Sequence, residues 1–194
     1  MRLIYFSTVM LLLALFCSCQ RDNTSAQVRQ MYSNKLALEL EQMVNLSYKS
    51  ELYPDSRFSL VCYFDSSECH TCATTKLYTW DKFIRKCEAN YSVNFIFIFS
   101  PKSDSRKYLL TYLEGKRERK NIYVDTLNIF ASKNRFIPAS PIYHTFLIDN
   151  FDNEVKMVGD PRRSPALEKL FDEIVGDQCY STCDSACNIN ISIE

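Results

Sequence analysis

The sequence predicts one α/β domain, a mixed central sheet flanked by helices, with an N-terminal helix and a cysteine-rich C-terminal tail. Two observations predict this class. Strand-like and helix-like segments alternate along the chain, which is typical of a sheet covered by helices on both faces. In addition, Asn94–Ser100 is an almost continuous apolar run, as expected for a strand buried on both of its faces.

The part of the chain before this apolar strand predicts a helix, a strand and a second helix. Apolar residues recur at helical spacing over 28–47, which predicts an amphipathic helix. Phe58–Phe64 is rich in residues that favour strands. Apolar positions three or four residues apart then predict a helix that begins at Cys69 or Cys72 and ends at Cys87.

The part after the apolar strand predicts a helix, a short strand, a short helix or turn, a hairpin and a last helix. The expected bounds are a helix capped by Ser103 or Asp104 and ending at Gly115, a strand Asn121–Asp125, a helix or turn Thr126–Lys133, hairpin strands His144–Asp149 and Glu154–Val158, and a helix from Pro165 to Gly176 with Ser164 as its N-cap.

The first residues resemble an export signal. One basic residue, Arg2, precedes the apolar run Val9–Phe16, which is too short for a membrane-spanning helix. The run is followed by Ser18-Cys19, and a small residue directly before a cysteine resembles the bacterial lipobox. We therefore expect residues 1–18 to be a signal peptide and Cys19 to be an acylated mature N-terminus that anchors the chain in a membrane.

Composition excludes several classes of protein. A hydrophobic fraction of 46% excludes a disordered chain, and 23 basic against 23 acidic residues argue against a nucleic-acid-binding protein. The nine cysteines indicate an oxidising compartment or thiol chemistry. Acylation of Cys19 would leave seven thiols, so at least one stays unpaired, pairs transiently or pairs with another molecule. No sequence pattern indicates a nucleotide, haem or other cofactor.

The motif Cys69-His70-Thr71-Cys72 lies between a predicted strand and a predicted helix. The first turn of a helix presents unpaired N–H groups and a positive dipole end, which stabilise the reactive thiolate form of cysteine. We expect Cys69 to attack and the more shielded Cys72 to resolve the mixed disulfide. His70 and Thr71 would tune the thiolate, whereas the carboxylate of Glu68 would disfavour it.

From Phe58 to Gly176 the sequence resembles the thioredoxin-like superfamily, nearest to the membrane-anchored TlpA type. The resemblance depends on the strand, CxxC motif and helix over 58–87 and on the segment Tyr143–Asp149 followed by a second short strand. It implies a central sheet with the dithiol at its C-terminal end, and thiol–disulfide exchange as the activity. The corresponding organisation is a signal peptide over 1–18, a tether and amphipathic helix over 19–57, a thioredoxin-like domain over 58–176 and a tail over 177–194.

The resemblance also implies that the loop before the segment 145–149 lies beside the dithiol and contacts substrate. Its expected substrate-binding residues are Pro141, Tyr143 and His144. This loop departs from the family pattern, because Tyr143 stands where the family has a cis-proline and Pro141 lies two residues earlier. Glu68 replaces the family's aromatic residue before the first cysteine, and Tyr63 replaces the buried acid six residues before it.

Other interpretations of the motif stay open. Cys69 and Cys72 could form a static disulfide or hold a metal. With His144 they would form a soft ligand set suited to Cu(I), similar to copper-delivery relatives of thioredoxin, and the domain could also be a redox-silent binding module. Cys179, Cys183 and Cys187 recur every four residues, so they could bind a metal or join the tail to Cys62 or Cys87.

These patterns together predict a membrane-anchored thiol–disulfide oxidoreductase of the bacterial cell envelope, facing the periplasm or the cell surface. Its expected partners are protein thiols and disulfides of the envelope and a membrane redox partner that recycles the dithiol. It would need no cofactor and bind no nucleic acid.

Overall fold

The structure of the protein is a computed structural model that describes residues 25–47, 52–67, 70–114 and 120–187, with the backbone alone for 70–74 and 177–187. The expected signal peptide, Cys19, Glu68 and Cys69 lie outside the described residues. Of the helices in the described part of the chain, none has both the length and the apolar character needed to span a membrane.

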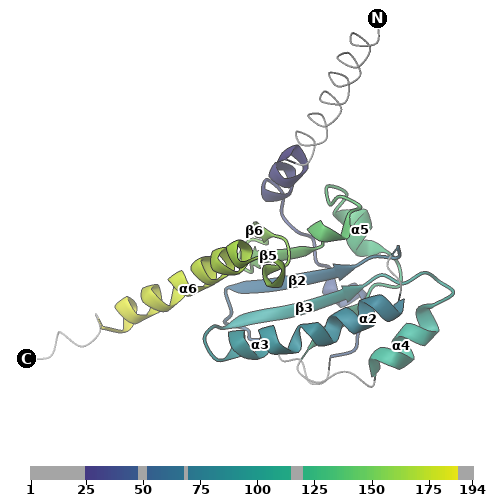
Figure 1. Ribbon diagram of the computed structural model, residues 1–194, viewed down its shortest axis with the longest axis horizontal. Coiled ribbons are helices and arrows are strands. Elements are labelled where there is room, and N and C mark those ends of the chain that lie inside the picture. The colour runs from purple at the N-terminus through teal and green to yellow at the C-terminus, as the bar shows by residue number, and fades with distance from the viewer. Residues whose placement is uncertain (1–24, 48–51, 68–69, 115–119, 188–194) are drawn as a thin grey trace, which may run out of the picture.

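A six-stranded mixed sheet forms the centre of the protein, in the order β1-β4-β3-β2-β5-β6 (Figure 1). Strands β2, β3 and β4 are parallel, while β1 pairs antiparallel with β4, β5 with β2, and β6 with β5. The strands are β1 (Val44–Asn45), β2 (Phe58–Phe64), β3 (Val93–Phe99), β4 (Asn121–Val124), β5 (Thr145–Asp149) and β6 (Val155–Val158). The expected mixed sheet is therefore confirmed, with the edge strand β1 as an addition that the sequence pattern does not predict.

Helices follow the strands in the predicted alternation. Residues 25–32 are helical, and the later α-helices are α2 (His70–Thr79), α3 (Asp81–Glu88), α4 (Arg106–Glu114), α5 (Ile129–Lys133) and α6 (Pro165–Cys187). Three single turns of 3₁₀-helix connect elements: η1 (Leu40–Gln42), η2 (Pro141–Tyr143) and η3 (Pro161–Arg163). Ser164 precedes α6 as expected, and its hydroxyl accepts the N–H of Ala166 at 3.2 Å.

Two hydrophobic cores lie on opposite faces of the sheet. Helices α2, α3, α4 and α6 cover one face, and Figure 1 shows α2 and α3 following one another along it. The other face is covered by α5 and by the N-terminal segment 25–43. Every residue of β2 and of β3 is buried, because both strands have helices or packed segments on both sides.

The helix expected from Cys69 or Cys72 to Cys87 is present as two consecutive helices that meet at Trp80. The N–H of Trp80 donates to the carbonyl of Leu77, three residues earlier, at 3.3 Å. This tighter 3₁₀-type turn interrupts α2, and the chain resumes helical geometry in α3. The indole of Trp80 is 2% exposed, so the interruption coincides with its insertion into the core.

The amphipathic helix predicted over 28–47 is wrong beyond residue 32. Residues 33–43 instead follow the sheet without an α-helix, with only the single turn η1, and bury Leu36 and Met43. Hydrogen bonds to other segments replace those of a helix, because the N–H of Leu36 donates to the carbonyl of Asn153 at 2.9 Å. Asn134 in addition exchanges side-chain hydrogen bonds with both backbone groups of Ala37.

The expected end of the last helix at Gly176 is also wrong, since α6 continues to Cys187. A glycine ends a helix when the chain turns into the left-handed conformation, and of the glycines described only Gly159 has a positive φ. A glycine that keeps helical geometry costs only about 1 kcal/mol relative to alanine. The backbone thus carries Cys179, Cys183 and Cys187 on one helix, beyond the part of α6 that packs against the sheet (Figure 1).

The burial of segment 25–43 predicts that it contributes to the stability of the domain. Leu36→Ala should lower the free energy of unfolding by about 2–5 kcal/mol, because the side chain is 1% exposed and its loss leaves a cavity. Leu127→Ala is the matched control, since Leu127 is 73% exposed, and should change stability by less than about 0.5 kcal/mol. Denaturant unfolding measures both, and equal small effects would place segment 25–43 outside the folded core.

Candidate functional site

The start of α2 meets the start of β5 at one end of the sheet. Strand β2 pairs in parallel with β3 on one side and antiparallel with β5 on the other, and Cys62 near its C-terminal end lies opposite Thr145. The chain leaves β2 at Phe64 and enters α2 at His70. Since β5 begins at Thr145, the loop before it reaches the same end of the sheet as the helix start. Such a point, where neighbouring connections diverge, is a common place for a binding site.

The CxxC motif is located at the beginning of α2. His70 is the first residue of the helix, and Thr71 and Cys72 occupy its next two positions, while Glu68 and Cys69 lie outside the described residues. The expected position of the motif at a strand-to-helix junction therefore agrees with the described backbone. The pairing of the cysteines and the tuning roles of His70, Thr71 and Glu68 remain predictions.

A small pocket of about 40 Å³ lies between α2, the C-terminal end of β2, η2 and η3. Its floor includes the buried side chains of Cys62 and Trp80, and Pro141 and Ile142 form part of its rim. The charged residues that line it are Lys76, Asp160, Arg162 and Arg163. The space exceeds the roughly 10–15 Å³ that admits one water molecule, so a small polar group can enter.

Arg162 is held in place by three neighbours. Its guanidinium forms a bidentate ion pair with Asp160, with distances of 2.9 and 2.7 Å, and donates to the hydroxyl of Thr79 at 2.6 Å. The guanidinium carbon lies 3.4 Å from the centroid of the Trp80 ring, a cation–π contact. These contacts connect η3 to the C-terminal end of α2, where a positive charge also interacts favourably with the helix dipole.

His144, expected beside the dithiol, packs mainly on the other face of the sheet. The residue is 3% exposed, and its ring lies 5.1 Å from that of Tyr63, centroid to centroid, on the face that α5 covers. Its Nε2 lies 2.9 Å from the carbonyl oxygen of Pro138, which can only accept, so Nε2 carries the proton. Nδ1 is buried and has no hydrogen-bond partner among the described residues.

The other two residues expected to contact substrate stand on η2. Pro141 is its first residue and lines the pocket, and Tyr143 is its last residue and is partly buried against the core on the α5 side. Pro141 and His144 thus both reach the pocket, whereas Tyr143 is not among its lining residues. The substrate-binding role of all three stays a prediction.

Cys62 and Tyr63 point to opposite faces of β2, as neighbours on a strand must. Tyr63, which occupies the position of the family's buried acid, packs with Phe130 on the α5 side of the sheet. Cys62 faces the side of α2 and is the titratable side chain of β2 on that face. Burial raises the pKa of the Cys62 thiol, and the Arg162 guanidinium only partly opposes this effect.

No group of three His, Cys, Asp or Glu side chains is arranged to hold a metal ion in the described part of the chain. The proposed copper ligands Cys69 and Cys72 fall outside that search, because their side chains are not described. The same holds for the three tail cysteines. Cys62 and Cys87 are free thiols in the structure.

Sequence reasoning missed Arg162, Asp160 and Thr79, and assigned Trp80 to the core alone. Arg162 and Trp80 are 82 positions apart, and no local pattern indicates that they will stack. One local signal could have indicated Arg162. Asp160-Pro161 soon after the hairpin is typical of the start of a helical turn, and the turn η3 found there carries Arg162 to the pocket.

No protein-family model and no curated protein matches the chain. Solved structures to which the chain is similar include an uncharacterized thioredoxin-like protein from Porphyromonas gingivalis, with 12% identity and a TM-score of 0.47 over 73% of this chain and 92% of that one. A domain of a possible thiol-disulfide isomerase from Cytophaga hutchinsonii has 18% identity and a TM-score of 0.44, over 78% of this chain and 95% of that one. The C-terminal domain of an uncharacterized protein from Bacteroides fragilis has 12% identity and a TM-score of 0.45, over 70% of this chain and 94% of that one.

The burial of two thiols predicts a clear difference in reactivity. Burial raises the pKa of the Cys87 thiol to about 12 and that of Cys62 further still, so neither forms the reactive thiolate in the folded protein. Iodoacetamide at about pH 8, near the pKa of a free thiol, should leave both unmodified until denaturant is added. Peptide mass spectrometry reads each site, and rapid labelling of Cys87 in the folded protein would contradict the described packing.

Proposed function

We propose that the protein is a thiol–disulfide oxidoreductase whose dithiol is Cys69 and Cys72. The observation that carries the proposal is that α2 begins inside the CxxC motif, at the C-terminal end of the buried strand β2. The first N–H groups of a helix have no acceptor within the helix and form its positive end. A thiolate at the adjoining position is therefore favoured over the thiol.

The exchange proceeds in two steps that conserve electrons. The Cys69 thiolate attacks one sulfur of a substrate disulfide, forming a mixed disulfide and releasing the other substrate sulfur as a thiolate. Cys72 then loses its proton and attacks Cys69, which releases the second substrate thiolate and leaves a Cys69–Cys72 disulfide. The substrate is reduced by two electrons, the dithiol is oxidised by two, and a membrane redox partner returns the dithiol to its starting state.

The pocket supports this assignment through helical spacing. Position 72 precedes Lys76 by four residues, so the two positions lie one turn apart on the same side of α2, and Trp80 directly follows the last residue of this helix. Lys76 and Trp80 both line the pocket. A substrate bound there would lie next to the resolving position, and the rim residues Pro141 and Ile142 would contact its main chain.

The oxidoreductase proposal predicts that activity depends on both cysteines of the motif. Cys69→Ser and Cys72→Ser should each abolish reduction of insulin by dithiothreitol above the uncatalysed rate. Cys72→Ser should also accumulate a covalent mixed disulfide with substrate, because Cys69 can still attack but nothing resolves the product. Non-reducing gels and mass spectrometry detect this adduct.

Cys87→Ala is the matched control, since Cys87 is buried between α3 and the sheet, away from the pocket, and should leave the turnover rate unchanged. Equal activity in the parent and both motif variants would end the proposal. Tight Cu(I) binding that requires Cys69, Cys72 and His144 would replace it by a copper-delivery role. Absence of both activities would leave a redox-silent binding module.

A lipid anchor at Cys19 would place this activity at the surface of an envelope membrane. The protein expressed in a bacterial host should partition into the detergent phase of Triton X-114 and carry the added mass of acyl chains at Cys19. Cys19→Ser should abolish both properties, whereas Cys17→Ser, two residues earlier and within the expected signal peptide, should retain them. Detergent partition that survives Cys19→Ser would contradict the lipobox.

A further inference from the structure

The pocket beside α2 carries more positive than negative charge. Lys76, Arg162 and Arg163 line it, against the single carboxylate of Asp160 among its described lining residues. Asp160 is already engaged by Arg162, at 2.7 Å between Nη2 and Oδ2, whereas its distance to the Nε of Arg163 is 3.9 Å. Of the two arginines, Arg163 is therefore the one whose charge Asp160 balances less.

The arrangement of Arg162 suits binding of an anion. Its contacts with Asp160 and Thr79 use three of the five N–H groups of a guanidinium. The contact with the Trp80 ring holds the guanidinium against a residue that also lines the pocket. Arg162 is thus pre-organised, with a side chain only 21% exposed, while Arg163 is 54% exposed and can reach an incoming group. A fixed cation beside an exposed one can hold a carboxylate without ordering a whole loop.

The rim of the pocket adds an apolar contact. Ile142 is 50% exposed although it stands beside the pocket on η2, and Pro141 precedes it. An extended segment could place an apolar side chain on this rim while an acidic group enters the pocket.

From this geometry we infer that the site selects disulfides that carry a carboxylate close to the reacting sulfur, such as a cysteine next to an acidic residue. The inference rests on the proposed function, because it assigns a substrate class to the same dithiol. Arg163 supplies long-range attraction, Arg162 positions the carboxylate, and position 72 on α2 lies one turn from Lys76.

The single tryptophan of the chain permits a test that does not depend on redox activity. Trp80 lies in the pocket wall, so its fluorescence reports on this site alone. In the Cys69→Ser/Cys72→Ser protein at constant ionic strength, 3,3′-thiodipropionate should change the emission in a saturable manner. The cationic analogue 2,2′-thiobis(ethylamine) should not.

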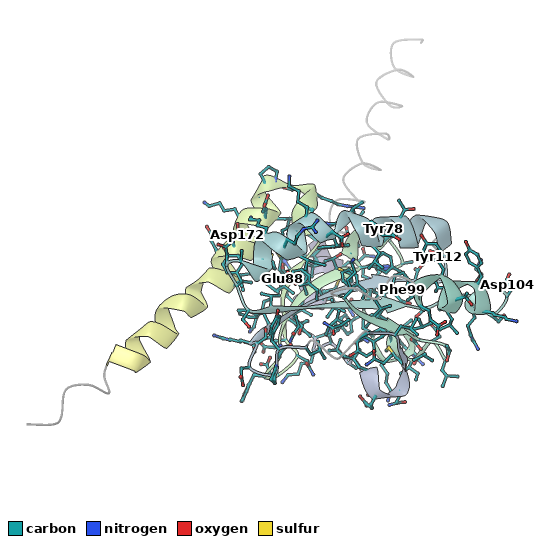
Figure 2. The ribbon with its side chains drawn as sticks, turned by 90° about the horizontal axis from the view of Figure 1, so that it is seen from below. Tyr78, Glu88, Phe99, Asp104, Tyr112 and Asp172 are labelled. Atoms are coloured by element: carbon teal, nitrogen blue, oxygen red, sulfur yellow. The ribbon has the colours of Figure 1, made fainter. Side chains whose placement is uncertain are left out.

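Charge variants then assign the effect to Arg163. Arg163→Gln should weaken the apparent affinity for thiodipropionate by about threefold and Arg163→Glu by about tenfold, as for a partly exposed ion pair. Arg85→Glu is the matched control and should change it by less than about twofold. Arg85 is exposed on α3, three residues before Glu88. Figure 2 shows Glu88 on the other side of the molecule from Asp104 and apart from Phe99, the last residue of β3.

The cysteine-containing protein gives the second readout. We compare the rate constant for reduction of the anionic 3,3′-dithiodipropionate with that for the cationic cystamine. The first divided by the second should fall in Arg163→Glu by about the same factor as the affinity for thiodipropionate. The rate constant with uncharged bis(2-hydroxyethyl) disulfide should stay the same. Equal responses of Trp80 to both thioether probes, or an equal effect of Arg85→Glu, would overturn the carboxylate preference. Lack of reaction with all three disulfides would instead overturn the oxidoreductase proposal, and the Trp80 titration would still decide whether the pocket binds carboxylates.

Discussion

The pairing of β2 with β3 on one side and β5 on the other determines where every other part of the candidate site lies. Both central strands are buried along their whole length, so β2 cannot shift by one residue without turning its apolar side chains away from their cores. With β2 fixed, the start of α2 and the loop that leads into β5 must meet at its C-terminal end. The start of α2, η2 and η3 lie at the same end of the sheet because of this register.

The cysteines of the domain fall into two chemical environments because of the same packing. Cys62 and Cys87 are enclosed by the core between the sheet and its helices, where desolvation keeps their thiols protonated. The CxxC motif coincides with a helix start, where the backbone favours the thiolate. In an oxidising compartment these buried thiols would stay unreactive, so that the proposed exchange would involve the motif alone.

The charge of the pocket has its origin in segments that are far apart in the chain. Arg162 stacks on Trp80, pairs with Asp160 and donates to Thr79, which joins the turn before α6 to the end of α2. These contacts hold the end of α2 against η3, and they place the Arg162 guanidinium at the wall of the pocket that the proposed substrate would enter.

Local pattern was sufficient for most of the secondary structure and for the placement of the motif. Strand-forming composition located β2, a continuous apolar run located β3, and repeats of three or four residues located the helices that follow them. The motif Cys69–Cys72 was expected at a helix start, and α2 begins within it. Where apolar spacing was compatible with more than one backbone path, as in residues 33–43, hydrogen bonds to Asn153 and Asn134 decided against a helix. The face on which His144 packs and the stacking of Arg162 on Trp80 were likewise decided by tertiary structure, because both depend on contacts between residues many tens of positions apart. The spacing of apolar residues in the sequence indicates which side chains are buried. The partners of a buried polar or charged group are distant in the sequence, so only the tertiary structure identifies them.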